Sequence, residues 1–263
     1  LGNRIMGECS RFSPDGRFVA AGAASPSVDI WDISKSELIH SFTTDFVLVS
    51  ALAFSPKGDF LAVGGPKNPK APAGKDELIL FDFKKRQRIA TISLACEPTH
   101  LIFSPDGRMI YGADSLSSIF VVDVDKRQVT KQWRGLDNKA KDIGVLGLSL
   151  SGDGKRLASG GRDSKVKVWE AETGKLIKSF DGHEQEVLAV ALSPDGKLVA
   201  STSFDGWMWV REIDSGRTVE RFDYGSNRPC SVTFAPDSQW VASGAKDGTI
   251  RLDRVADFQF LAP

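Results

Sequence analysis

The sequence has few of the residues from which catalytic and metal sites are built. It holds three histidines, three cysteines and three methionines among 263 residues. No spacing among His, Cys and acidic residues resembles a metal site, and there is no Gly-x-Ser-x-Gly elbow or phosphate-binding loop. Cys9, Cys96 and Cys230 lie far apart and are odd in number, which argues against a disulfide framework. We therefore expect no metal, no cofactor, small buried thiols and a cytoplasmic location.

An excess of charge of either sign is also absent. Lys plus Arg and Asp plus Glu both number 34, so the formal net charge is zero. This balance argues against a dominant nucleic-acid or membrane-surface role. No apolar run approaches the roughly 18 residues of a membrane span. The first residues, Leu1 to Arg4, lack the apolar segment of a signal peptide. The missing initiator Met indicates a fragment of a longer protein.

What the chain does have is one turn, used six times. In Ser193-Pro194-Asp195-Gly196, Pro presets φ, Asp suits the third position and Gly accepts a left-handed conformation. Apolar runs on both sides predict an antiparallel hairpin. The other copies begin at Ser13, Ser55, Ser104, Ser151 and Ala235, at intervals of 42, 49, 47, 42 and 42 residues. A period near 42 indicates a repeat architecture.

Each repeat is predicted to contain four strands, which we call a to d. In the fourth repeat they are Val145–Leu150, Arg156–Gly160, Val166–Trp169 and Leu176–Phe180. From the first turn residue to the end of strand c is 18 residues in five repeats, which predicts that strand c ends at Trp31, Val122, Trp169, Arg211 and Asp253. The second repeat has 26, ending at Phe81, because residues 66–75 insert a loop between strands b and c.

Composition predicts how these sheets pack. Strand a is apolar on both faces, as in Val187–Leu192, so it is expected to be innermost and covered twice. Strand d is more polar, as in Lys175–Phe180, and is expected at the rim. Four-stranded units placed radially pack on their neighbours and protect their edges. Trp31 and Trp169 fit a packing position on strand c, and Trp207 and Trp209 are interpreted as packing between sheets.

The motifs resemble those of WD-repeat β-propellers. Strand c ends in an aromatic or apolar residue followed by an acid, and Gly182-His183 precedes a strand a. The resemblance covers nearly the whole chain and implies an all-β fold in one domain, residues 1–263, with blades starting near residues 5, 48, 97, 144, 185 and 228. The strand-end pairs are Trp31-Asp32, Phe81-Asp82, Val122-Asp123 and Trp169-Glu170.

The resemblance also implies a hydrogen-bonded tetrad of His, Ser or Thr, Asp and Trp in each blade. No repeat has all four residues. The fourth lacks the His, with Leu136 in its place, and the fifth and sixth carry Arg211 and Asp253 at the Trp position. The matching residues are Ser159, Asp163 and Trp169 in the fourth repeat, His183, Ser201 and Asp205 in the fifth, and Ser243 and Asp247 in the sixth.

The number of blades leaves two readings open. The first repeat begins with strand a, and the last supplies its own strand d through Phe258–Leu261. Six blades close by simple abutment in one reading. In the other, the chain holds six blades of a seven-bladed propeller, and the seventh lies outside this fragment.

The resemblance implies that partners dock on the face formed by the b–c and d–a loops, at the mouth of the central channel. The matching loop positions are Arg162, Phe204 and Lys246. Basic residues in the insertion and in the fourth d–a loop are expected on the same side, and solvated loop charge is the alternative interpretation. These residues are Lys67, Lys70, Lys75, Lys139 and Lys141.

The sequence therefore favours a non-catalytic scaffold, a monomeric domain that binds an acidic protein or peptide and neither nucleic acid nor membrane. A propeller hydrolase or lyase with a site at the channel mouth is the alternative. That alternative needs convergent His, acid or metal groups. Acid pairs such as Asp163 and Asp205 recur with the repeat, and turn capping explains them better than paired-carboxylate catalysis.

Overall fold

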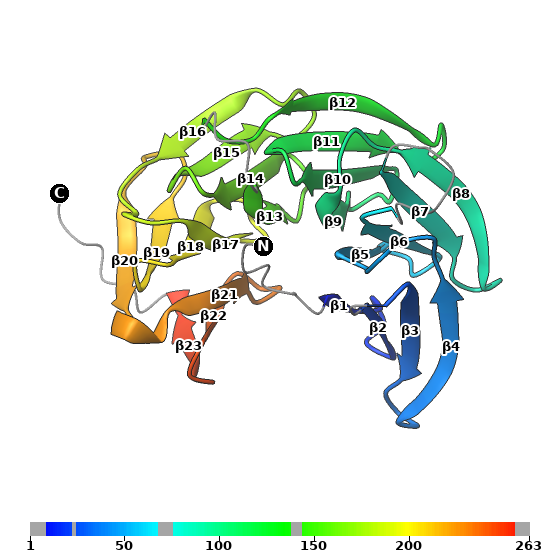
Figure 1. Ribbon diagram of the computed structural model, residues 1–263. Coiled ribbons are helices and arrows are strands. Elements are labelled where there is room, and N and C mark those ends of the chain that lie inside the picture. The colour runs from blue at the N-terminus through cyan, green and yellow to red at the C-terminus, as the bar shows by residue number, and fades with distance from the viewer. Residues whose placement is uncertain (1–8, 23–24, 68–75, 138–143, 256–263) are drawn as a thin grey trace. The chain divides into compact units, whose positions relative to one another are not determined.

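A computed structural model describes residues 9–22, 25–67, 76–137 and 144–255 (Figure 1). In these ranges the chain forms antiparallel strands and a single turn of 3-10 helix, η1 (Gly225–Asn227). No helix in the described part of the chain is long and apolar enough to cross a membrane. The predicted all-β class is confirmed.

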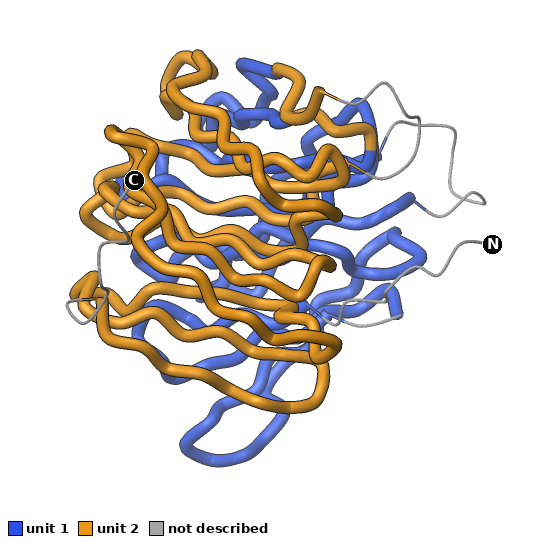
Figure 2. Tube along the Cα trace, turned by 90° about the vertical axis from the view of Figure 1, so that its left-hand side faces the viewer, with its two compact units in different colours: residues 1–115, 119–132 blue, residues 116–118, 133–263 orange. Residues whose placement is uncertain are grey.

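The chain divides into two compact units, coloured separately in Figure 2. The N-terminal unit comprises residues 1–115 and 119–132, and the C-terminal unit comprises residues 116–118 and 133–263. Each unit contains three successive sheets, and each sheet pairs its strands in sequence order.

The N-terminal unit holds three four-stranded sheets. Strand β5 packs beside β1, and β9 packs beside β5. The first sheet is β1 (Cys9–Phe12), β2 (Phe18–Gly22), β3 (Ser27–Asp32) and β4 (Glu37–Thr43); the second is β5 (Ala51–Phe54), β6 (Phe60–Gly65), β7 (Glu77–Asp82) and β8 (Gln87–Ser93); the third is β9 (Pro98–Phe103), β10 (Met109–Asp114), β11 (Ser118–Asp123) and β12 (Gln128–Arg134).

The C-terminal unit follows the same plan. Strand β17 packs beside β13, and β21 packs beside β17. Its sheets are β13 (Val145–Leu150), β14 (Arg156–Gly161), β15 (Val166–Glu170) and β16 (Leu176–Phe180); then β17 (Val187–Leu192), β18 (Leu198–Ser203), β19 (Trp207–Glu212) and β20 (Thr218–Asp223); then β21 (Pro229–Phe234), β22 (Trp240–Ala245) and β23 (Ile250–Arg254).

The strand predictions are accurate to about one residue. The six third strands each end one residue beyond the predicted position, and β13 and β16 have the predicted bounds. The sixth sheet has three strands in the described residues. The predicted fourth strand, Phe258–Leu261, lies outside those residues, so the manner of closure stays a prediction.

The repeated turn has the predicted conformation. Gly196 has φ of 70°, and its N–H donates to the Ser193 carbonyl at 2.8 Å. Ser193 adds a contact that the turn rules alone did not predict. Its buried Oγ donates to Asp195 Oδ1 at 2.6 Å and accepts the Leu198 N–H at 2.9 Å. The hydroxyl thus stabilises both the turn and the first pair of the hairpin.

Burial follows the predicted difference between inner and outer strands in much of the described chain. Strands β5 and β17 are largely buried, whereas β4 and β16 are largely exposed. The first strand of the first sheet departs from the prediction, because Phe12 is 67% exposed. Within its unit the first sheet packs on the second alone.

Two side-chain predictions are wrong. Trp31 is 42% exposed, because Val28 and Ile30 occupy the buried face of β3 and Trp31 points to the other face. Cys230 is exposed on β21, whose sheet likewise packs on one neighbour within its unit. Trp169, in contrast, is buried, as predicted.

Candidate functional site

The fifth sheet carries a hydrogen-bonded chain that fixes its loops. His183, from the loop before β17, contacts Asp205 Oδ2 through Nδ1 at 2.8 Å and Ser201 Oγ through Nε2 at 2.9 Å. The Asp205 carboxylate also accepts the backbone N–H groups of Glu184 at 3.0 Å and Trp207 at 2.9 Å. Two loops are therefore tied together by one carboxylate.

Electrostatics favours a structural role for the hydrogen-bonded residues His183, Asp205 and Ser201. Burial lowers the pKa of His183 and outweighs the opposing effect of Asp205, so the ring is neutral at pH 7. A neutral ring donates from Nδ1 to Asp205 and accepts the Ser201 hydroxyl at Nε2. Burial alone would raise the pKa of Asp205, but hydrogen bonds from Trp207, His183 and Glu184 lower it overall. The pair is already satisfied within the protein.

Arg211 stands at the strand position where the tetrad has Trp. The ring that packs near His183 is instead that of Trp209. The Trp209 ring lies 5.3 Å from the His183 ring, and the buried Arg211 guanidinium lies 4.1 Å from the Trp209 centroid. Arg211 also donates to the Asp181 carbonyl at 2.7 Å. Burial lowers the pKa of Arg211 to about 10, so it remains charged at neutral pH.

In the fourth sheet, which lacks the His, a buried lysine contacts the Asp of the tetrad. Trp169 Nε1 donates to Ser159 Oγ at 2.9 Å, and Asp163 accepts the Asp137 N–H at 3.0 Å. Lys167 Nζ lies 3.1 Å from Asp163 and 2.6 Å from Asp137, with its side chain 3% exposed. No spacing rule for the tetrad pointed to Lys167.

The sixth sheet keeps less of the pattern. Ser243 is buried and bonds to the Tyr224 hydroxyl, which comes from the preceding loop. Asp247 accepts the Thr249 N–H at 2.9 Å, within its own turn. Tyr224 therefore supplies the partner that His supplies in the fifth sheet.

The C-terminal unit brings three of the predicted loop residues into one surface. Arg162 Nε lies 3.2 Å from Glu186 Oε1, and the Phe204 N–H donates to the Glu186 carbonyl at 3.0 Å. The Arg228 guanidinium lies 4.6 Å from the centroid of the Phe204 ring, and the Lys246 N–H donates to the Arg228 carbonyl at 3.1 Å. We call Arg162, Glu186, Phe204, Arg228 and Lys246 the loop surface.

Arg228 has an unusual backbone within the loop surface. It follows η1 with φ of 37° and ψ of 105°, and it is exposed. A non-glycine residue there is strained by roughly 1–3 kcal/mol, a kind of strain that clusters at binding sites. Sequence reasoning missed Arg228 and Glu186 because both precede a strand a, whereas the repeat motif drew attention to the residue before each b–c Asp.

The remaining predicted lysines do not join this surface in the described residues. Lys67 Nζ pairs with Glu77 at 2.8 Å, and its side chain is 18% exposed, so it is not a free surface cation. Lys70, Lys75, Lys139 and Lys141 lie outside the described residues. Among the described residues no three His, Cys, Asp or Glu side chains are grouped to hold a metal ion.

Sequence comparison identifies the repeat. A family model described as "WD domain, G-beta repeat" matches residues 7–32, 36–67, 136–170, 174–210 and 218–252, more than half of the chain. The six antiparallel sheets are consistent with blades of that repeat. The matched residues cover most of the first, fourth, fifth and sixth repeats and the first two strands of the second, and none lies in the third.

The chain is also similar to curated proteins over part of their length. It is 33% identical over 167 residues to the small ribosomal subunit protein RACK1 of Neurospora crassa, covering 61% of this chain and 50% of that protein. It is 27% identical over 166 residues to the human WD repeat-containing protein 36, covering 63% and 17%. It is 23% identical over 176 residues to GID complex subunit 7 of Schizosaccharomyces pombe, covering 66% and 33%. The chain spans half or less of the length of these relatives.

Proposed function

The chain belongs to the WD40 repeat family, and on that premise we propose that it is a non-catalytic scaffold for a protein or peptide partner. Proteins built from this repeat are typically interaction scaffolds. Two relatives are named as parts of assemblies, a small ribosomal subunit protein and a subunit of the GID complex. A function in binding agrees with these names, although the fold alone does not fix a function.

The observation that carries the proposal is the continuity of the loop surface across three sheets. Its residues contribute three cations, one carboxylate and the half-buried ring of Phe204. A flat aromatic ring beside guanidinium groups is the composition in which binding energy concentrates at protein interfaces. The charge balance favours an acidic partner.

The loops beneath this surface are held in place before any partner arrives. Asp205 ties the loop of Glu184 to the turn of Trp207, and Asp163 ties Asp137 to its own turn. A preorganised surface loses less conformational entropy on binding. The same hydrogen bonds occupy the His and Asp groups that a hydrolase or lyase needs, which supports a binding role over the enzymatic alternative.

The proposal is tested by selecting peptides from a display library on the purified protein and measuring their affinity by calorimetry. We expect the selected peptides to be acidic. Lys246→Glu and Phe204→Ala are expected to weaken their binding about tenfold. Lys197→Glu is the control. Lys197 is exposed in the same sheet as Phe204, at the opposite end of that sheet, beside the Asp195 turn. Equal binding by all four proteins would contradict this assignment.

A monomeric state and a cytoplasmic location belong to the same proposal. Sedimentation equilibrium of the purified chain tests the first, since a self-associating chain would show a mass above 28.5 kDa. Fractionation of the source cell tests the second.

A further inference from the structure

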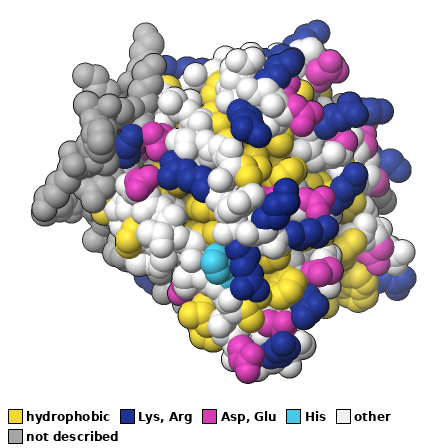
Figure 3. Space-filling model, turned by 90° about the vertical axis from the view of Figure 1, so that its right-hand side faces the viewer, with side chains coloured by type: hydrophobic (Ala, Val, Ile, Leu, Met, Phe, Trp, Pro, Cys, Tyr) yellow, Lys and Arg dark blue, Asp and Glu magenta, His cyan; other side chains and the backbone are white. Residues whose placement is uncertain are grey.

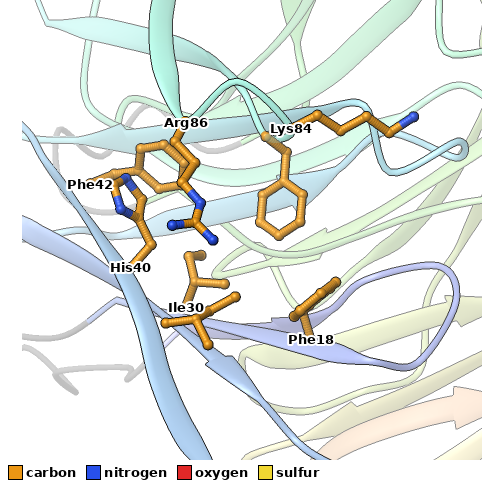
Figure 4. A pocket seen from close by; sticks show the side chains of 8 residues that line it. Phe18, Ile30, His40, Phe42, Lys84 and Arg86 are labelled. Carbon is orange, nitrogen blue, oxygen red and sulfur yellow. The ribbon is translucent and has the colours of Figure 1, made fainter.

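The N-terminal unit has an apolar pocket of about 230 Å³ between its first two sheets (Figure 4). Its floor includes Ile30 and Phe42, which are 1% and 3% exposed. The pocket is smaller than the roughly 300–1,000 Å³ of a drug-sized ligand site, so it suits one bulky side chain. Its lining also includes Phe18, Ile39, His40, Phe83, Lys84 and Arg86.

The mouth of this pocket carries one uncompensated positive charge. Lys84 Nζ pairs with Asp59 at 2.7 Å, and Lys85 Nζ pairs with Asp82 at 3.5 Å. Arg86 has no carboxylate within ion-pair distance among the described residues. In Figure 4 the Arg86 guanidinium lies over the pocket beside His40, whereas Lys84 points away. Figure 3 shows basic side chains around exposed hydrophobic ones on the face that bears β4 and β8.

His40 adds an uncharged aromatic wall, since its ring is neutral at pH 7. Burial lowers the pKa of His40, and the nearby Arg86 lowers it further. The ring also packs edge-on against Phe42, with centroids 4.5 Å apart. The pocket therefore presents apolar walls and a guanidinium at the rim.

The backbone of Arg86 has a left-handed conformation, which is strained for a residue other than glycine. Its φ is 56°, whereas the equivalent turns of the fourth and fifth sheets have Gly174 and Gly216, with φ of 75° and 81°. Glycine adopts this conformation without steric cost. Arginine at this position therefore reduces stability relative to glycine.

The next pair of sheets offers a built-in comparison. There Arg127 has φ of 55° at the same turn position, so its backbone is strained alike. The residues equivalent to His40, Phe83 and Lys84 are Ala90, Val124 and Asp125. An acid replaces the base two residues before the arginine, so this second turn lacks the same excess of positive charge.

We propose that the pocket is a docking site for an extended peptide that inserts one bulky apolar side chain and pairs an adjacent carboxylate with Arg86. The apolar walls receive the side chain, and the planar guanidinium suits a carboxylate with two parallel hydrogen bonds. This site lies in the N-terminal unit and is separate from the loop surface, so it goes beyond the proposed function.

The probe is an end-capped peptide, Ser-Glu-Phe-Glu-Ser, added to the full chain at low salt. We expect the ring signals of His40 in NMR spectra to shift and saturate. Two matched peptides, with Lys for both Glu or Ala for Phe, are expected to leave those signals unchanged. No His40 shift with the acidic aromatic peptide at millimolar concentration would overturn the proposal.

Two arginine variants isolate the role of the charge. Arg86→Gly and Arg127→Gly both relieve backbone strain, so both should melt at or above the temperature of the parent protein. Only Arg86→Gly is expected to weaken binding of the peptide, by about tenfold, because it removes one charge-assisted pair. Equal affinities for the two variants would contradict the inference.

Further experiments distinguish a peptide from other possible occupants of the pocket. Decanoate has an apolar body and one carboxylate, and saturation by decanoate without a response to the peptide would overturn the peptide assignment. If the protein forms a dimer that Arg86→Gly dissociates, a second copy of the chain is the occupant, and this result would also overturn the peptide assignment. Phe204→Ala, on the loop surface, is expected to leave peptide binding at the pocket unchanged. This separates a failure here from a failure of the proposed function.

Discussion

The side chain of Ser238 accepts a hydrogen bond from the backbone N–H of Asp195, with its Oγ 3.2 Å away. These residues belong to equivalent turns of the sixth and fifth sheets. One sheet earlier, the Gly152 N–H donates to the Pro194 carbonyl at 3.0 Å. The repeated turn therefore closes its own hairpin and also links neighbouring sheets within the C-terminal unit.

Gly196→Val is expected to destabilise the protein more than Ser238→Gly. Gly196 has φ of 70°, and an added Cβ would make only ordinary contacts with Ser151 and Arg156, so the effect is conformational, roughly 1–3 kcal/mol. Ser238→Gly relieves strain at φ of 59° but removes the hydrogen bond to Asp195, so we expect a neutral or stabilising change. Urea denaturation measures both. Ser238→Ala is the control, since it loses the bond and keeps the strain; equal shifts of the same sign for Gly196→Val and Ser238→Gly would refute the shared turn.

Asp205→Ala is expected to lower the free energy of unfolding by about 1–3 kcal/mol, because it leaves a buried His183 and two backbone N–H groups without their acceptor. Asp247→Ala is the matched control in the sixth sheet, where the exposed carboxylate accepts the Thr249 N–H within its own turn. We expect a smaller effect there. Thermal and urea unfolding of both variants provide the measurement, and a larger loss for Asp247→Ala would contradict this explanation.

Lys167→Met is expected to destabilise by about 3 kcal/mol, since it leaves Asp163, with a side chain only 5% exposed, without its counter-ion. Lys165→Met removes a partly exposed cation from Asp137 and Asp181, and we expect a change below about 1 kcal/mol. The double variant Lys167→Met with Asp163→Asn should recover part of the loss. Additive losses in the double variant would show that the two charges do not interact.

Because of His100, we expect the free energy of unfolding to decrease as the pH is lowered. Burial, with a smaller effect from Arg11, lowers its pKa to about 4, against about 6.5 in the unfolded chain. Between these values the unfolded state binds a proton that the folded state refuses, so the free energy of unfolding decreases as pH drops from 6.5 toward 4. We expect about 2 kcal/mol, allowing for partial exposure of the ring.

The check is urea denaturation at pH 7.5 and pH 4.5 for the parent protein and His100→Gln. The variant should lose less stability between the two pH values. It should still lose some, because burial also lowers the pKa of His183 and acts in the same direction. Identical pH dependence in the two proteins would exclude this role for His100.

The sequence predicted the features that depend on local backbone chemistry. Gly196 had to adopt positive φ, and the fixed distance from the turn located the ends of the third strands in five repeats, whereas in the second the pair Phe81-Asp82 marked the end. These features repeat six times, so each copy supports the others. Hairpin register is set by the turn, which is why the strand bounds agree so closely.

The sequence could not predict contacts that depend on which side chains meet across loops. Lys167 lies within the predicted strand Val166–Trp169, and the repeat motif did not indicate that its Nζ would lie between two acids. Arg228 and Glu186 connect the loop surface from positions that the repeat leaves variable. Trp31 lies on the face of β3 opposite to Val28 and Ile30, and the motif of its own repeat does not show which face is covered.

The pairing of every described strand with its neighbour in the sequence has a consequence for synthesis. Each hairpin can form as soon as its own residues leave the ribosome, because the strands that pair in a sheet are consecutive in the sequence. Loop closures this short are fast, and domains of repeats can grow by adding one element at a time. The order of translation can therefore serve as the order of folding, and a pause between repeats would expose only one incomplete sheet.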